Sequence, residues 1–243
     1  MKASIIIPAW NAWEYTDKCL KALEVDDDVE VIVVDNGSTD ATVNIGLFYD
    51  VDVLRFRHNQ GFARGCNAGA AVASGDILVF LNNDTEPSEP DWLDDLLGAF
   101  NRATIGAAGP MSNYVAGGQQ LDYSTWKSQG WRRMYLPTAE VLSGFCLAVR
   151  RAAWDQIGGF HTDYPIGGWE DVELCDDLLA AGWELCIAYG SFVFHYGQRT
   201  FHANDLNSRE IYESHRGVYA TRHDPSDLPD PYSGRHDQGR QPC

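Results

Sequence analysis

Three clusters of polar residues in the first half of the sequence each follow directly on an apolar run. They are residues 8–11 (PAWN), 35–38 (DNGS) and 82–84 (NND), and a further polar segment, residues 59–69, follows another such run. Each cluster alone is adequately explained as a turn, because Asn, Asp, Gly and Ser are common turn residues. Their repetition indicates a ligand site, since the carboxyl ends of parallel strands meet along one edge of a sheet.

The residue types in these clusters suit a polyanionic ligand that is held through a metal ion. The formal net charge of the chain is -17, so a polyanionic ligand needs a counter-charge. A hard divalent cation with oxygen ligands supplies that charge, and Asp84 is placed to provide one such oxygen. Asp35 or Asn36 can pair with the base or ribose, and Arg64 can offset phosphate charge or contact the base.

Short β-branched runs alternate with helical segments around these clusters. The alternation predicts an α/β fold with a mainly parallel central sheet flanked by helices. In the first half we expect strands at residues 4–8, 30–34, 51–56 and 76–81, helices at residues 14–23 and 63–73, and a helix cap at Ser38 or Thr39.

The second half loses this rhythm between residues 112 and 137. Long irregular segments in compact domains are often functional, so this segment is predicted to be an acceptor-side loop. A strand at residues 145–149 and helices at 151–157 and 171–181 follow. We expect a single domain over residues 1–221, divided into a nucleotide-sugar-binding half (1–111) and an acceptor or catalytic half (112–221), and a polar, mobile tail over residues 222–243.

The order and spacing of the clusters resemble the nucleotide-binding half of the family 2 glycosyltransferases. In that family the first strand ends in Pro-x-x-Asn, the second in Asp followed by Asp or Asn and Ser, and the fourth in a D-x-D-like triplet. Here the triplet departs at its first residue, Asn82, and keeps Asp84, the position that usually meets the metal. The resemblance covers about residues 3–200. It implies a GT-A (Rossmann-like) fold whose donor site includes Pro8, Ala9, Asn11, Asp35, Asn36, Gly61, Arg64, Asn82 and Asn83.

The segment 158–183 (GGFHTDYPIGGWEDVELCDDLLAAGW) resembles the catalytic part of the same family. In inverting members the Asp of the Glu-Asp pair is the general base, which implies that role for Asp171 and a sugar or acceptor contact for Glu170. The alternative is helix capping, because the helix dipole favours carboxylates at this position. His195 follows the apolar run 192–194 and resembles a metal or diphosphate contact of the family, although it is equally typical of a packed, hydrogen-bonded histidine.

The resemblance implies a metal-dependent (Mn²⁺ or Mg²⁺), inverting glycosyltransferase. The donor would be a UDP-, dTDP- or GDP-sugar, and the acceptor a glycan or another hydroxyl-bearing molecule. The Gly-Gly-Phe motif and the sequence VDNGS favour the branch that includes rhamnosyltransferases. A non-catalytic nucleotide-sugar-binding module would keep Asp35 and Asp84 but need no base at Asp171. A sugar nucleotidyltransferase would need a Gly-rich, basic loop after the first strand, which residues 8–13 do not provide.

Composition excludes several other classes of protein. The absence of an apolar run of about 18 residues predicts no membrane span, and the start of the chain lacks the layout of a signal peptide, so we expect a cytoplasmic protein. The negative charge disfavours general nucleic-acid binding. Six scattered cysteines without a C-x-x-C pair predict neither a zinc cage nor a disulfide framework.

Overall fold

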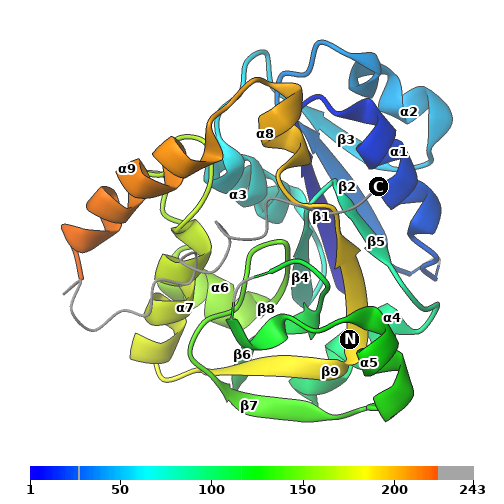
Figure 1. Ribbon diagram of the computed structural model, residues 1–243, viewed down its shortest axis with the longest axis vertical. Coiled ribbons are helices and arrows are strands. Elements are labelled where there is room, and N and C mark those ends of the chain that lie inside the picture. The colour runs from blue at the N-terminus through cyan, green and yellow to red at the C-terminus, as the bar shows by residue number, and fades with distance from the viewer. Residues whose placement is uncertain (27, 116, 224–243) are drawn as a thin grey trace.

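The computed structural model describes residues 1–26, 28–115 and 117–223, without the side chain of Thr138. Within these ranges a nine-stranded sheet lies between two layers of helices (Figure 1). The strands are β1 (Ala3–Ala9), β2 (Glu30–Asp35), β3 (Asp52–Arg55), β4 (Ile77–Leu81), β5 (Thr85–Pro87), β6 (Ile105–Met111), β7 (Tyr135–Ala139), β8 (Cys146–Arg150) and β9 (Glu184–His195). The α-helices are α1 (Trp13–Ala22), α2 (Ile45–Phe48), α3 (Phe62–Val72), α4 (Trp92–Leu97), α5 (Tyr123–Gln129), α6 (Arg151–Ile157), α7 (Glu170–Ala180), α8 (Arg199–Ala203) and α9 (Ser208–Ala220), and the short 3-10 helices are η1 (Ala41–Asn44), η2 (Gly98–Asn101) and η3 (Gly117–Gln119).

The first four strands form a parallel sheet in the order β3-β2-β1-β4, as the sequence predicts. Every residue of β1 and β4 is buried. This burial explains why both strands are nearly continuous apolar runs, because helices cover both faces of a parallel sheet. The polar residues that follow these strands therefore meet at one edge of the sheet.

Alternate residues of β1 belong to two different cores. Ile5 and Ile7 pack with α1 and α4 on one face, whereas Ile6 packs with α3, α6 and α7 on the other. The approach of α3 is close: a Cβ atom at Gly69 would lie 2.4 Å from Ile6 Cγ2. Glycine at this position lets the helix pack directly on the strand and fixes the loop that leads into it.

The sheet becomes mixed beyond β4, so the predicted parallel arrangement holds only for the first half. β8 is antiparallel to both β4 and β6, and β9 is antiparallel to β5 and β7, while β6 and β9 are parallel. The prediction rested on helices alternating with strands, which is the pattern of parallel crossover units. The segment between β7 and β8 has no helix, and there the pattern carries no information on strand direction.

The segment 112–137 is more ordered than predicted, and this is a correction. It contains η3, the helix α5 and the start of β7. The Asp122 side chain caps α5 by accepting a hydrogen bond from the Thr125 N–H, and the Trp126 ring packs against Phe192 of β9. These long-range aromatic contacts stabilise a helix that has no clear apolar period of its own.

The predicted cap at Ser38 or Thr39 is also corrected, because Asp40 caps η1 by accepting from the Thr42 N–H. Ser38 instead accepts a hydrogen bond from the Asn11 N–H, which joins the loops after β1 and β2. Ser38 and Asp40 lie in the same turn, and the backbone geometry of that turn decides which of the two side-chain oxygens faces the first N–H groups of η1.

Helices α8 and α9 follow β9 and were not predicted. Figure 1 shows α8 beyond the ends of the first strands, and α9, in orange, beside α7 at the edge of the molecule. Arg222 joins α9 to α7 through hydrogen bonds of 2.8 and 2.9 Å to the two Glu173 carboxylate oxygens. The rest of the predicted tail, residues 224–243, lies outside the described residues.

Two composition-based expectations concern the described ranges. Every helix in them is too short or too polar to span a bilayer, and the cytoplasmic location stays a prediction. Cys19, Cys66, Cys146, Cys175 and Cys186 are buried free thiols.

Candidate active site

A cavity of about 960 Å³ lies at the carboxyl ends of β1 and β4 and is open to solvent. Its walls come from the loops after the first strands, from the N-terminal end of α7 and from the segment that leads into α9. The lining residues predicted from the sequence are Pro8, Ala9, Asn36, Asn82, Asn83, Asp84, Glu170, Asp171 and His195. The fold thus brings the two halves of the predicted site together.

Asp84 and His195 face each other in this cavity because of the pairing between β5 and β9. Thr85 is opposite His195 in the antiparallel register, and the Tyr196 N–H donates to the Asp84 carbonyl at 2.9 Å. The Asp84 Oδ1 atom lies 3.3 Å from His195 Nε2, and both side chains are buried. Residues 111 positions apart in sequence therefore form one adjacent pair.

The hydrogen bonds of His195 determine which ring nitrogen faces Asp84. Nδ1 lies 2.8 Å from the Tyr114 carbonyl oxygen, which can only accept, so Nδ1 carries the hydrogen. In the neutral ring, Nε2 then directs a lone pair toward the Asp84 carboxylate. A cation between these two acceptors removes their repulsion, and adjacent ligands of one ion at about 2.1 Å would be about 3 Å apart. The pair therefore fits a divalent metal.

The electrostatics of Asp84 agree with a charged carboxylate in this position. Burial raises its pKa, but the His195 ring in its protonated form and the backbone N–H of Arg199 lower it more, and the pKa lies below its usual value. Among the described residues, no three His, Cys, Asp or Glu side chains gather closely enough to hold an ion by themselves. Further ligands for an ion at Asp84 and His195 would come from the diphosphate and from water.

Glu170 and Asp171 begin α7 and are buried at the cavity wall. Asp171 Oδ2 accepts from the Gly144 N–H at 2.8 Å, and its Oδ1 accepts from the Val172 N–H at 3.0 Å. The first of these bonds joins α7 to the loop before β8. Two N–H groups hold this carboxylate in place at the cavity wall, where it can meet the proton of a bound hydroxyl group.

The capping interpretation of this acidic pair is only partly met. The N-cap residue of α7 is Trp169, which has a φ of 80° and makes no side-chain capping bond. Asp171 accepts from one first-turn amide, that of Val172, but its other oxygen is directed out of the helix toward Gly144. The Asp171 carboxylate therefore does more than cap the N-terminus of α7.

Four predicted residues lie outside the cavity lining. Asp35 is fully buried and accepts from the Ser38 N–H at 2.9 Å and from Arg55 Nε at 2.7 Å. The Asn11 side chain accepts from the Thr39 N–H at 2.7 Å, and so supports the loop. The remaining two are Gly61, whose carbonyl accepts from the Asn36 amide, and Arg64, which is exposed.

The sequence reasoning missed Arg199, which lines the cavity beside Asp84. Its N–H donates to Asp84 Oδ2 at 3.2 Å, and its guanidinium lies 5.4 Å from the Tyr15 ring centroid. Its Nε is buried without a hydrogen-bond partner. Of the described lining residues it is the only lysine or arginine, whereas Arg64 is not among them. Its position just after the His195 strand end was a usable signal.

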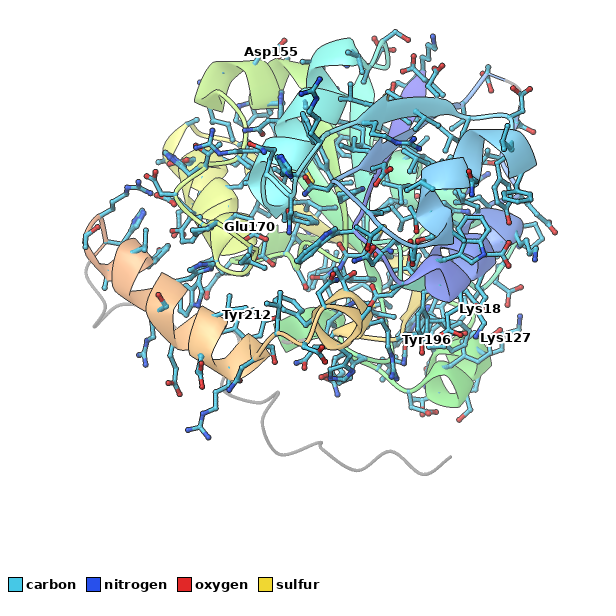
Figure 2. All side chains as sticks on the ribbon, turned by 90° about the horizontal axis from the view of Figure 1, so that it is seen from above. Lys18, Lys127, Asp155, Glu170, Tyr196 and Tyr212 are labelled. Carbon is cyan, nitrogen blue, oxygen red and sulfur yellow. The ribbon has the colours of Figure 1, made fainter. Side chains whose placement is uncertain are left out.

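An apolar wall completes the cavity, made by Phe62, Ile166, Phe201, Leu206 and Tyr212. In Figure 2, Glu170 lies at the start of α7 and Tyr212 on the facing helix α9. The Trp169 indole donates to the Tyr212 carbonyl at 3.1 Å, which fixes α9 over the beginning of α7. These five side chains are partly exposed, so they are available to a ring-shaped ligand.

Comparison with known proteins relates this geometry to one family. The family model described as glycosyl transferase family 2 matches residues 4–158. That range covers the parallel half of the sheet, the Asn82-Asn83-Asp84 loop and the strand β8.

Two similar proteins come from Mycobacterium tuberculosis. The pre-mycofactocin glycosyltransferase is 28% identical over 243 residues, which cover 95% of this chain and 50% of that protein. The N-acetylglucosaminyl-diphospho-decaprenol L-rhamnosyltransferase is 30% identical over 206 residues, with 69% of this chain and 66% of that protein covered. The chain spans about half the length of the first of these relatives.

Among solved structures, the mannosyltransferase from Pyrobaculum calidifontis in complex with GDP-Man and Mn²⁺ superposes with a TM-score of 0.68. The sequences are 20% identical, and the match covers 95% of this chain and 66% of that one. At this identity the likeness shows the fold alone, and it confirms the predicted GT-A fold.

Proposed function

The chain belongs to glycosyl transferase family 2, and from this membership we propose that it transfers a sugar from a nucleotide-diphosphate donor to an acceptor hydroxyl group with inversion. The observation that carries the proposal is the meeting of Asp84, His195 and Asp171 in one cavity. The first two suit a metal and a diphosphate, and the third suits proton removal. A donor and an acceptor would thus bind side by side.

The donor would bind at the carboxyl ends of the parallel strands, over Pro8, Ala9 and Asn36. Asp84 and His195 would hold Mn²⁺ or Mg²⁺, which supplies charge stabilisation to the departing diphosphate. Arg199 would contact the same phosphates, since it lines the cavity and its backbone N–H bonds to Asp84. Asp35, Asn11 and Gly61 would act indirectly by supporting the loops that bear the contacting residues.

Asp171 would remove the proton from the acceptor hydroxyl as its oxygen attacks the anomeric carbon. The new bond forms between that oxygen and the carbon, and the carbon–oxygen bond to the diphosphate breaks. The proton passes to Asp171, and the nucleoside diphosphate leaves with the bonding electron pair. Glu170, the neighbouring carboxylate, would contact the sugar or the acceptor.

Residues 1–111 would form the donor half and 112–221 the acceptor half of one domain. The similarity to a rhamnosyltransferase supports a deoxyhexosyl or hexosyl donor, and the GDP-Man of the superposed mannosyltransferase supports a nucleoside-diphosphate sugar. UDP-, dTDP- and GDP-sugars remain the donor set to test, with a glycan or another hydroxyl compound as acceptor.

The test is a panel of UDP-, dTDP- and GDP-sugars assayed for release of nucleoside diphosphate, with Mn²⁺, with Mg²⁺ and with chelator. We expect turnover of one donor class with metal and at least a hundredfold less with chelator. Binding without turnover for every donor and acceptor would indicate the non-catalytic module. Synthesis of a nucleotide sugar from a nucleoside triphosphate and a sugar phosphate would indicate a nucleotidyltransferase.

A further inference from the structure

The side chain of Gln119 is a buried amide, and Gln119 is not one of the residues that line the cavity. Its Nε2 donates to the Pro110 carbonyl at 2.8 Å, and its Oε1 accepts from the Ser143 N–H at 2.8 Å. The first partner can only accept and the second can only donate, so the orientation of the amide is determined. Gln119 therefore ties the end of β6 to the loop before β8.

That loop also holds the carboxylate of Asp171. The Gly144 N–H, next in sequence to Ser143, donates to Asp171 Oδ2 at 2.8 Å. A Cβ atom at Gly144 would lie 3.1 Å from Asp171 Cβ, so the loop and the side chain are in close contact. On the other side, the Leu142 N–H lies 3.3 Å from Cys175 Sγ of α7. A shift of residues 142–144 would thus move the Gly144 N–H relative to Asp171.

We propose that Gln119 is a positioning residue for the transfer step, which it serves by holding the Ser143–Gly144 backbone against Asp171. The proposal rests on the proposed function, in which Asp171 is the general base. It also assigns a role to one residue of the segment 112–137, which the sequence singled out for its irregularity. Asn113 and Tyr114 of this segment bond to His195, so one turn supports both chemical ends of the site.

Glutamine suits this position because it has a donor and an acceptor on one short, planar group. A glutamate would place a carboxylate oxygen against the Pro110 carbonyl, where two acceptors would meet in a buried place. A methionine would fill a similar volume but make neither of these two hydrogen bonds. Gly109 also matters, because a Cβ atom there would lie 2.4 Å from Gln119 Nε2.

The test compares Gln119→Met with Gln120→Met, the same change at the exposed neighbouring residue. The rate is measured as single-turnover release of nucleoside diphosphate with Mn²⁺, from the fastest donor of the UDP-, dTDP- and GDP-sugar panel. We expect Gln119→Met to slow this step about ten- to a hundredfold, because small misplacements of a reacting group are costly. The affinities for UDP and GDP with Mn²⁺ should stay within twofold, and Gln120→Met should match the unaltered chain.

A double-mutant cycle shows whether the effect passes through Asp171. In an Asp171→Asn background, Gln119→Met should slow the step less than twofold further, because the group that it positions is already gone. Gln119→Asn, which keeps the amide on a shorter side chain that cannot reach both partners, is the second variant if the methionine variant does not fold, and it should also slow the step. Equal losses in both backgrounds would overturn this proposal alone. Full activity of Asp171→Asn would overturn the base assignment together with it.

Discussion

At the scale of single residues, chemistry depends on which atoms the buried polar side chains present to the cavity. Asp84 Oδ1 and His195 Nε2 lie 3.3 Å apart, and the bond from His195 Nδ1 to the Tyr114 carbonyl holds the ring in this orientation. Asp171 presents a carboxylate already held by two backbone N–H groups. Substitutions at these positions separate binding from chemistry.

Asp84→Ala should remove one ligand of the proposed metal ion. We expect the affinity for UDP or GDP in Mn²⁺ to fall at least tenfold and turnover to fall with it, because the diphosphate loses its counter-charge. Calorimetry with and without Mn²⁺ measures the first effect. Asp94→Ala, an exposed position on α4, is the matched control. A folded Asp84→Ala protein with unchanged metal-dependent affinity would exclude Asp84 from the metal site.

Asp171→Asn should slow the single-turnover step about a hundred- to ten-thousandfold while donor affinity stays unchanged, as expected for a lost general base. The amide cannot accept from Val172 and Gly144 together, so we also expect a loss of stability of about 1–3 kcal/mol. Rates must therefore be measured well below the melting temperature.

The control for this substitution is Asp155→Asn, an exposed aspartate of α6 that Figure 2 shows far from Glu170. It should leave both the rate and the melting temperature unchanged. If Asp171→Asn loses only stability and keeps its rate, the carboxylate is structural, and Glu170 becomes the candidate base.

At the scale of elements, the short helix α8 completes the site. Thr200 donates to the Asn83 side chain at 3.1 Å, and Asn204 lies 2.6 Å from the Asn11 amide nitrogen, so α8 is joined to two loops at the ends of parallel strands. Arg199 is thereby held beside Asp84. Helix α8, which supplies the positively charged Arg199, comes late in the sequence, whereas the loops after β1 and β4 that it contacts come early.

Arg199→Gln should weaken binding of UDP or GDP about ten- to a hundredfold, because hydrogen bonds to charged groups contribute about 1.5–3 kcal/mol. Its backbone bond to Asp84 does not involve the side chain and should persist. Arg209→Gln, at an exposed position on α9, is the control and should bind normally. The affinities are compared at low and at high salt. Equal nucleotide affinities for the two variants would show that Arg199 does not contact the phosphates.

At the scale of the whole molecule, the docking of α9 on α7 determines whether the apolar wall is in place. Trp169 and Tyr219 pack with ring centroids 5.3 Å apart, and His215 Nδ1 lies 3.2 Å from the Gly168 carbonyl. Burial lowers the pKa of His215 below 6.5, although the carbonyls of Gly168 and Gly167 oppose the shift. The folded protein therefore favours the neutral ring.

When a histidine has a lower pKa in the folded than in the unfolded protein, the fold is most stable at a pH above the unfolded-state pKa. Stability is lost as the pH falls from there toward the folded-state pKa, because the unfolded protein binds more protons. We therefore expect the urea midpoint to fall between pH 7 and pH 5.5, and to fall less in His215→Gln, which can donate to Gly168 but does not titrate. Urea unfolding of both proteins at these two values measures the difference. The same pH dependence in both proteins would assign it to other groups.

The sequence by itself determined the first half of the fold and the chemistry of the site. Short β-branched apolar runs that alternate with helical segments are typical of strands covered on both faces, so β1, β2 and β4 and the polar residues after them were predictable. The family resemblance also identified Asp84, His195 and Asp171, all of which line the cavity. The local pattern of residue types is enough to predict a strand and its end where a buried apolar run is followed directly by polar residues.

Only the tertiary structure decided which of the predicted polar residues face the cavity. Asp35 and Arg64 have suitable chemistry, but Asp35 is buried against Arg55 and Arg64 is exposed. Arg199 is joined to Asp84, and Gln119 to Ser143, by contacts that span 115 and 24 positions of the chain. Such contacts depend on how strands pair and helices dock, and these steps follow from the packing of the whole chain, which no local pattern of residue types records.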